Sequence, residues 1–108
     1  MQNIIAIIWD FDKTLVDGYM QDPIFEEYKV NASEFWKEVN TLPGKYREEG
    51  VKINPDTIYL NHFINYVRKG IFKGLNNAKL KSYGDIQKFY PGIPDIFKTT
   101  SELLNDDP

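Results

Sequence analysis

Two aspartates one residue apart, Asp10 and Asp12, follow an apolar run directly, and Thr14 comes two residues later. Alternate side chains of an extended segment point to the same side, so the two carboxylates are expected to share one pocket near the Thr14 hydroxyl. Like charges held close together repel, which raises the proton affinity of one carboxylate unless a cation neutralises them. The pattern therefore suits either a divalent cation with oxygen ligands, typically Mg²⁺, or an ionised carboxylate beside a protonated one.

The apolar run that precedes the aspartates, residues 4–9, is rich in β-branched side chains and does not alternate with polar ones. Such a run is typical of a strand that is buried on both faces of a parallel sheet. Ligands of open α/β sheets bind just beyond the carboxyl ends of the strands, where Asp10 and Asp12 would lie. The plain alternative is an ordinary strand exit with solvated Asp and Lys and a turn capped by Thr14. The apolar lead-in and the position of the threonine favour the functional interpretation.

Residues 9–16, Trp-Asp-Phe-Asp-Lys-Thr-Leu-Val, resemble the first motif of the haloacid dehalogenase-like (HAD) superfamily, an apolar run followed by Asp-x-Asp-x-Thr. The resemblance covers residues 4–18 closely. It implies a Rossmann-like parallel sheet whose first strand carries the nucleophile Asp10, which forms an aspartyl-phosphate. It also implies that Asp12 is the general acid and base and that Thr14 supports the site and its substrate.

The same resemblance implies a Mg²⁺ ion held by the side chain of Asp10 and the backbone carbonyl of Asp12. Relatives that cleave carbon–halogen bonds lack the second aspartate, so Asp12 implies phosphoryl transfer. Catalysis of that reaction rests mainly on positioning and on neutralising charge. The expected function is a Mg²⁺-dependent phosphohydrolase that acts on a small phosphomonoester.

The rest of the sequence predicts helices separated by turn residues, so this chain alone is expected to be mostly α. Asp22, then Asn31 or Ser33, are the predicted amino-terminal caps of the first two helices, and Pro43-Gly44 is expected to end the second. The predicted helices span residues 23–29, 32–39, 45–49, 54–69, 77–83 and 94–104.

In the predicted helix 54–69 the apolar face has the i, i+3, i+4, i+7 spacing and consists of Leu60, Phe63, Ile64, Val67 and Ile71. His62 lies about 200° around the helix from Leu60 and is therefore expected to be exposed. The chain also has a basic stretch, made up of Arg68, Lys69, Lys73, Lys79, Lys81 and Lys88. It is interpreted as a solvated face, because the whole chain is acidic.

The resemblance implies three parts: residues 1–16 as the nucleophile strand of a core domain, 17–89 as a helical cap, and 90–108 as the return into a core helix. An ordinary α-rich body is the alternative for the middle part. A doubly buried strand needs neighbours, which a longer parent chain or a second copy would supply, unless the strand prediction is wrong. We favour the longer chain.

The family's remaining motifs, a Ser or Thr after a strand, a Lys and an acidic pair, are not identified. Candidates for them, Lys98, Thr99, Thr100 and Ser101, lie in the last predicted helix, and Asp106 and Asp107 are interpreted as a solvated end. The chain is therefore interpreted as an amino-terminal portion of a larger phosphatase. The alternative is a catalytically inactive fragment or a helical protein-interaction module.

Composition limits the other classes of function. With 108 residues, 42% hydrophobic and 15% aromatic, the chain is expected to form a globular domain rather than a disordered one. It has no cysteine and a net charge of −3, which argues against disulfides, nucleic-acid partners and anionic membranes. Its apolar run is too short for a signal peptide or a membrane span, so the expected location is the cytoplasm. Self-association is expected only if sheet edges are exposed.

Overall fold

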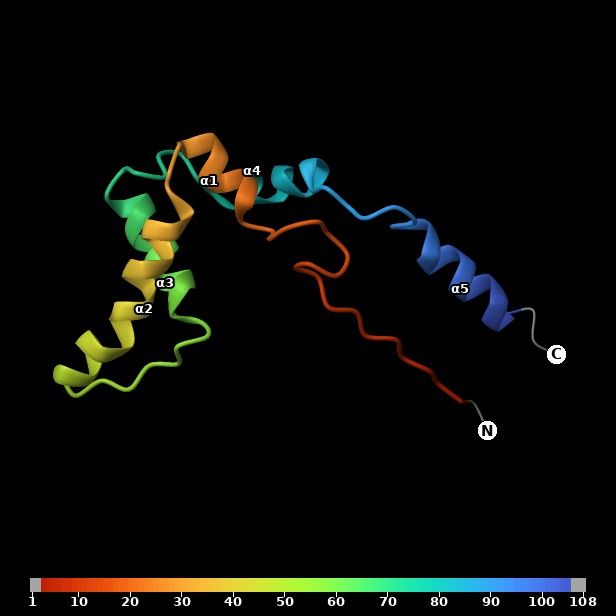
Figure 1. Ribbon diagram of the computed structural model, residues 1–108, viewed down its shortest axis with the longest axis horizontal. Coiled ribbons are helices and arrows are strands. Elements are labelled where there is room, and N and C mark those ends of the chain that lie inside the picture. Colours follow the sequence, from red (N-terminus) through yellow and green to blue (C-terminus); the bar gives the residue numbers. More distant parts are fainter. Residues whose placement is uncertain (1–2, 106–108) are drawn as a thin grey trace. The chain divides into compact units, whose positions relative to one another are not determined.

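The computed structural model describes residues 3–105 of the chain, and its regular structure is helical (Figure 1). The helices in that range, in chain order, are α1 (Asp22–Tyr28), α2 (Ala32–Glu48), α3 (Ile58–Arg68), α4 (Asn77–Ser82), the 3-10 helix η1 (Tyr83–Ile86) and α5 (Asp95–Asn105). Asp106 and Asp107, which were interpreted as a solvated end, lie outside the described residues.

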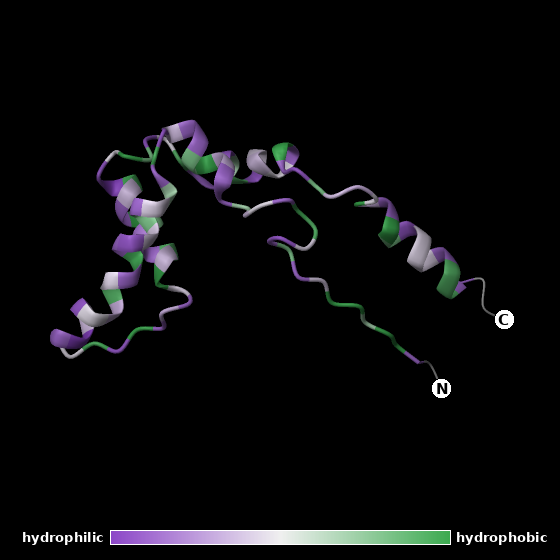
Figure 2. Cartoon of the chain, viewed as in Figure 1, coloured by the Kyte–Doolittle hydropathy of each residue, from purple (hydrophilic) through white to green (hydrophobic). Residues whose placement is uncertain are grey.

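The predicted Rossmann-like parallel sheet is wrong: residues 3–105 contain no strand and no sheet, only isolated β-bridges. The predicted strand at residues 4–9 is an extended segment without a ladder partner, and its apolar character shows as a green stretch of the chain in Figure 2. Ile4 and Ile8 are 90% and 93% exposed, whereas the prediction had them buried. An apolar pattern favours a strand only when neighbouring strands accept its backbone hydrogen bonds, and none does so within the described range.

The chain divides into two compact units. The described part of unit 1 consists of residues 3–21 and 86–105, and unit 2 consists of Asp22–Asp85. Unit 2 is thus a continuous insertion between the two segments of unit 1. Its limits lie within the predicted cap, residues 17–89, but the role of a cap stays a prediction.

Local interactions explain where α1 ends and where α2 begins. Lys29 follows α1 in the left-handed conformation, with φ 54°, which stops the helix. The Asn31 side chain accepts a hydrogen bond from the backbone N–H of Glu34 at 3.2 Å and caps α2, so the cap is Asn31 rather than the other predicted candidate, Ser33. Helix α2 then runs through Pro43, where the sequence predicted a break. A buried or half-buried stripe continues along it past the proline, formed by Phe35, Val39, Leu42 and Tyr46, so packing holds the helix together.

The core of unit 2 is largely aromatic. Phe35 and Phe72 are fully buried, and the Phe35 ring lies 5.1 Å from that of Phe25 and 5.0 Å from that of Phe63. Offset and edge-to-face ring pairs of this kind stabilise a core beyond the area that they bury. The cluster joins α1, α2, α3 and the loop after α3 into one body.

Helix α3 presents a different face to this core than the sequence predicted. Ile58, His62 and Tyr66 are its buried residues, one turn apart, whereas Leu60 and Ile64 are 52% and 50% exposed. The prediction that the aliphatic face is buried is therefore wrong at Leu60 and Ile64, and the predicted exposure of His62 is wrong as well.

The last helix, α5, begins at Asp95, one residue after the predicted start, and none of its residues is buried. Lys98 pairs with Glu102 at 3.9 Å, and the Thr99 hydroxyl donates to the carbonyl oxygen of Asp95 at 3.1 Å. These polar residues are thus engaged on the helix surface. No helix within residues 3–105 is long and apolar enough to cross a membrane.

Candidate functional site

The residues that carry the predicted chemistry lie in a tight loop that follows the extended amino-terminal segment. The carbonyl oxygen of Phe11 accepts from three successive backbone N–H groups, of Thr14, Leu15 and Val16, at 3.2, 2.9 and 3.3 Å. The N–H of Lys13 donates across the loop to the carbonyl of Gly18 at 2.9 Å. Lys13 and Gly18 have φ values of 59° and 146°, which reverse the chain direction.

The far side of this loop is anchored within unit 1. Leu15 and Val16 are buried, at 8% and 2% exposure. The N–H of Tyr90 donates to the carbonyl of Leu15 at 3.0 Å, and the N–H of Asp17 donates to the carbonyl of Lys88 at 2.7 Å. The Tyr90 hydroxyl also donates to the Asp17 carboxylate at 3.3 Å. The loop is therefore held by a segment more than 70 residues away in sequence.

The predicted site residues occupy the exposed side of the loop. The Thr14 hydroxyl donates to Oδ2 of Asp10 at 3.0 Å, so the structure brings these two residues together. The half-buried Asp12 instead accepts a hydrogen bond at Oδ1 from the backbone N–H of Met20, at 2.9 Å. Each carboxylate is thus oriented by a hydrogen bond to one of its two oxygens. The second oxygen of each is a further acceptor that a ligand could use.

Aromatic side chains flank the loop on both sides of Asp10. The Trp9 ring meets Phe97 of α5 edge-on at 5.8 Å, and the Phe11 ring meets Phe89 at 6.3 Å. The ammonium group of Lys13 lies 5.4 Å above the Tyr19 ring. These contacts position the backbone around Asp10 without covering its exposed carboxylate.

A second polar group, in unit 2, was missed by the sequence reasoning. Nε2 of His62 lies 2.7 Å from Oε2 of Glu38, and the Tyr66 hydroxyl donates to the same oxygen at 2.7 Å. The hydrogen bond from Tyr66 and then that from His62 hold the pKa of Glu38 below its usual 4.5. Burial and the Glu38 carboxylate raise the pKa of Tyr66 to about 12. The i, i+4 spacing of Ile58, His62 and Tyr66 was the available signal for this face.

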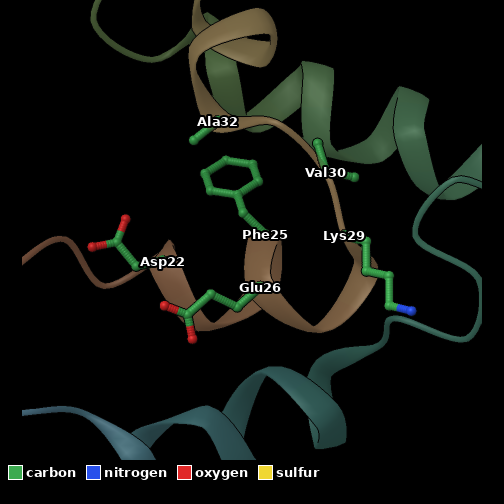
Figure 3. Close-up of a pocket in the computed structure, with 6 residues that line it drawn as sticks. All are labelled: Asp22, Phe25, Glu26, Lys29, Val30 and Ala32. Carbon is green, nitrogen blue, oxygen red and sulfur yellow. The ribbon is translucent and has the colours of Figure 1, made fainter.

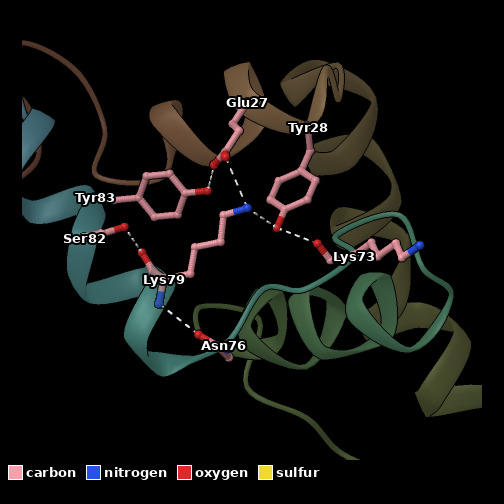
Figure 4. A network of polar contacts seen from close by, with 7 residues as sticks. All are labelled: Glu27, Tyr28, Lys73, Asn76, Lys79, Ser82 and Tyr83. Carbon is pink, nitrogen blue, oxygen red and sulfur yellow. Dashed lines mark hydrogen bonds and ion pairs between the residues drawn. The ribbon is translucent and has the colours of Figure 1, made fainter.

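A third polar group ties α4 to α1 (Figure 4). The ammonium of Lys79 pairs with Glu27 at 3.1 Å and donates to the Tyr28 hydroxyl at 2.9 Å, and the Tyr83 hydroxyl donates to Glu27. The Tyr83 hydrogen bond lowers the pKa of Glu27, and the Tyr28 hydrogen bond raises that of Lys79. Burial and the bond to Glu27 raise the pKa of Tyr83 to about 12. These residues bond to one another across the two helices, which indicates a structural role.

An open hollow of about 380 Å³ lies beside α1 (Figure 3). Its lining includes the Phe25 ring and three charged side chains, and it consists of Asp22, Phe25, Glu26, Lys29, Val30 and Ala32. The sequence reasoning did not predict this hollow.

The chain is similar in sequence to a known protein. A protein of Borreliella burgdorferi described as uncharacterized is 43% identical to this chain over 103 residues. The match covers 94% of this chain and 36% of the relative, so the chain spans about a third of the length of the protein that it matches. No family model matches the chain. No solved structure matches it. Membership of the HAD superfamily accordingly stays a prediction that rests on residues 4–18.

Proposed function

We propose that this chain carries the nucleophile loop of a Mg²⁺-dependent phosphohydrolase of the HAD-like kind. One observation carries the proposal: the Asp-x-Asp-x-Thr residues sit together on one anchored loop, with the Thr14 hydroxyl on the Asp10 carboxylate and the Met20 N–H on that of Asp12. An exposed carboxylate held in a fixed orientation is what attack on a phosphorus atom requires.

In the proposed reaction, an oxygen of Asp10 attacks the phosphorus of a phosphomonoester, and the bond from phosphorus to the leaving oxygen breaks. Asp12 donates a proton to that oxygen, which leaves as an alcohol. Asp12 then takes a proton from water, and the water oxygen attacks the phosphorus of the aspartyl-phosphate. This step releases inorganic phosphate and restores both carboxyl groups to their starting states.

The donors present fit a magnesium ion in type. Mg²⁺ is commonly bound through one or two carboxylates, with water and phosphate oxygens completing its coordination. Asp10, through its side chain, and Asp12, through its backbone carbonyl, would hold it, as the resemblance implies. Within residues 3–105 there is no group of three or more His, Cys, Asp or Glu side chains that could hold a metal by themselves, so water and substrate would supply the other ligands. When bound, the ion would neutralise charge on the phosphoryl group.

A small phosphorylated molecule in the cytoplasm is the expected substrate, rather than a nucleic acid or a membrane lipid, because the chain has a net charge of −3. In this proposal unit 2 selects the substrate, as helical caps do in the family that the motif resembles.

Hydrolysis of p-nitrophenyl phosphate with and without Mg²⁺, by this chain and by longer forms that contain it, tests the proposal. We expect Mg²⁺-dependent turnover that Asp10→Asn abolishes and that Asp85→Asn, an exposed acid in unit 2, leaves unchanged. Full turnover by Asp10→Asn would overturn the proposed nucleophile.

A second candidate is a catalytically inactive module that binds a partner polypeptide. The exposed apolar side chains of unit 1 favour it, among them Ile4, Ile5, Ile8, Leu103 and Leu104. It predicts no hydrolysis by any form of the chain and the same thermal stability with and without Mg²⁺. A Mg²⁺-dependent rise in melting temperature that is lost in Asp10→Asn would argue against this candidate.

A further inference from the structure

Helix α3 is apolar around most of its circumference but is covered on one side only. Ile58, His62 and Tyr66 face the core of unit 2, while Leu60 and Ile64 are 52% and 50% exposed. Leu60 and Ile64 are four residues apart and therefore lie one above the other along the helix. Together, Leu60 and Ile64 form an exposed aliphatic surface, which we call the ridge of α3. A helix with so wide an apolar surface is normally buried on both sides.

Residues of opposite charge flank this ridge at equal separations in the sequence. Asp56 precedes α3 and Arg68 is its last residue, and both side chains are exposed. Leu60 and Ile64 lie two residues on either side of position 62, and Asp56 and Arg68 lie six residues on either side of it. Neither Asp56 nor Arg68 has an ion-pair partner among residues 3–105. The surface is therefore complementary to itself when it is turned end to end.

We propose that the ridge of α3 is the docking surface for a second copy of this chain, with the two α3 helices packed antiparallel about a two-fold axis at position 62. Leu60 of each copy then packs on Ile64 of the other, and Asp56 of each copy meets Arg68 of the other. A two-fold interface uses the same patch on both copies, which the symmetric spacing provides. Antiparallel helix dipoles favour the same arrangement.

The expected dimer is weak. Stable interfaces bury about 1,200 Å² or more in total, and a ridge of two side chains per copy contributes less than this. Packing of aliphatic ridges at an interaxial distance of about 8 to 10 Å still excludes water from all four side chains. Association is thus expected to depend on concentration. The inference does not depend on the chemistry proposed for Asp10 and Asp12.

Sedimentation velocity of the full chain over a range of concentrations tests the dimer. We expect the double variant Leu60→Gln/Ile64→Gln to raise the dimer dissociation constant by about tenfold or more, because every aliphatic contact at the ridge is lost. The matched control is Leu80→Gln, which removes a 44% exposed leucine from α4 and should leave association unchanged. Far-UV circular dichroism verifies that each variant keeps its helices.

A charge exchange then distinguishes self-pairing from any other association. At low salt, Asp56→Arg alone and Arg68→Asp alone each place like charges together twice per dimer, and each should weaken association about fivefold. An equimolar mixture of the two variants should associate like the original chain, because every Asp then faces an Arg again. A chain that is monomeric at all concentrations, a dimer that the ridge variant does not weaken, or a mixture as weak as the single variants would overturn the proposal.

Discussion

Nε2 of His62 lies 2.7 Å from Oε2 of Glu38 and so joins α3 to α2 across 24 residues of sequence. The His62 ring is buried against Phe35, with ring centroids 5.0 Å apart, and the side chain of Glu38 is 52% exposed. The carboxylate thus reaches from solvent to the edge of the core, where Tyr66 also donates to it. Removing its charge would weaken the hydrogen bonds that His62 and Tyr66 make to it, because bonds to a charged acceptor are the stronger ones.

Glu38→Gln should make the stability of unit 2 less dependent on pH in the acid range. The pKa of Glu38 is lowered in the folded chain, so its stabilising effect is present above about 4.5 and is lost as the pH falls through the folded pKa. The variant should therefore lose stability near neutral pH, while its stability falls less steeply on acidification. Urea unfolding at several pH values measures both effects, with Glu48→Gln, an exposed residue of the same helix, as the control. An unchanged acid slope in Glu38→Gln would contradict the prediction.

Tyr66→Phe should make the stability of unit 2 less dependent on pH in the alkaline range. The pKa of Tyr66 rises from 10.0 to about 12 on folding, so stability should be constant below pH 10 and should fall as the pH rises from there toward 12. The phenylalanine keeps the ring but removes the hydroxyl that titrates and donates to Glu38. We expect the variant to lose about 1 kcal/mol at neutral pH and to have a shallower alkaline decline. Ultraviolet titration of the tyrosines, with Tyr59→Phe as a control, gives an independent measure; an identical alkaline transition in both variants would refute the assignment.

Lys79→Gln should release α4 from α1. Helix α4 has only six residues and is too short to be stable by itself, so its contacts with Glu27 and Tyr28 hold it in place. The backbone amides of α4 should exchange with solvent faster in this variant, while those of α2 should not change. Lys81→Gln, an exposed lysine of the same helix, is the matched control. Equal exchange in both variants would mean that the polar group does not retain the helix.

Phe35→Ala should unfold much of unit 2. Phe35 is 0% exposed and meets the rings of Phe25, Phe63 and Tyr66, so the substitution leaves a large cavity in the centre of the cluster. Changes of this kind cost about 3 to 5 kcal/mol, which is comparable to the whole stability of a small domain. Leu80→Ala, at an exposed site, should have little effect on the urea midpoint. A midpoint shift of similar size in both variants would argue against the described core.

The sequence predicted the elements whose determinants are local. Asn31 caps α2 through its own side chain, and the helix after Pro94 begins at Asp95, because each needs only neighbouring residues. The break predicted at Pro43 is wrong because the continuation of the helix depends on distant residues. The helix continues because Phe35, Val39, Leu42 and Tyr46 pack on other parts of unit 2, and no local rule contains that packing.

The predictions for residues 4–9 and for His62 are also wrong because the outcome depends on residues far away in the sequence. The apolar residues 4–9 match the pattern of a buried strand, yet a strand exists only where another segment accepts its hydrogen bonds. His62 was placed on the polar side of α3 because leucine and isoleucine defined the apolar side. The buried side is instead the one that lies against Phe35 and Glu38 of α2. At the site, spacing predicted that the Thr14 hydroxyl lies near the carboxylates, and it bonds to Asp10, whereas the bond from Met20 to Asp12 required the loop to close.

The closure of that loop gives the last prediction, because two backbone positions should respond in opposite directions. Gly18 has a φ of 146°, where an alanine is strained, so Gly18→Ala should weaken the loop by about 1 to 2 kcal/mol. Lys13 has a φ of 59°, which costs an L-residue about 1 kcal/mol, so Lys13→Gly should relieve strain and strengthen the Lys13–Gly18 hydrogen bond. Exchange of the Met20 amide, which donates to Asp12, reports on closure: it should quicken in Gly18→Ala and slow in Lys13→Gly. Gly44→Ala in α2, where a Cβ meets nothing within 4 Å, is the control and should leave the Met20 amide unchanged. If both loop variants quickened exchange alike, the backbone geometry would not be what orients Asp12.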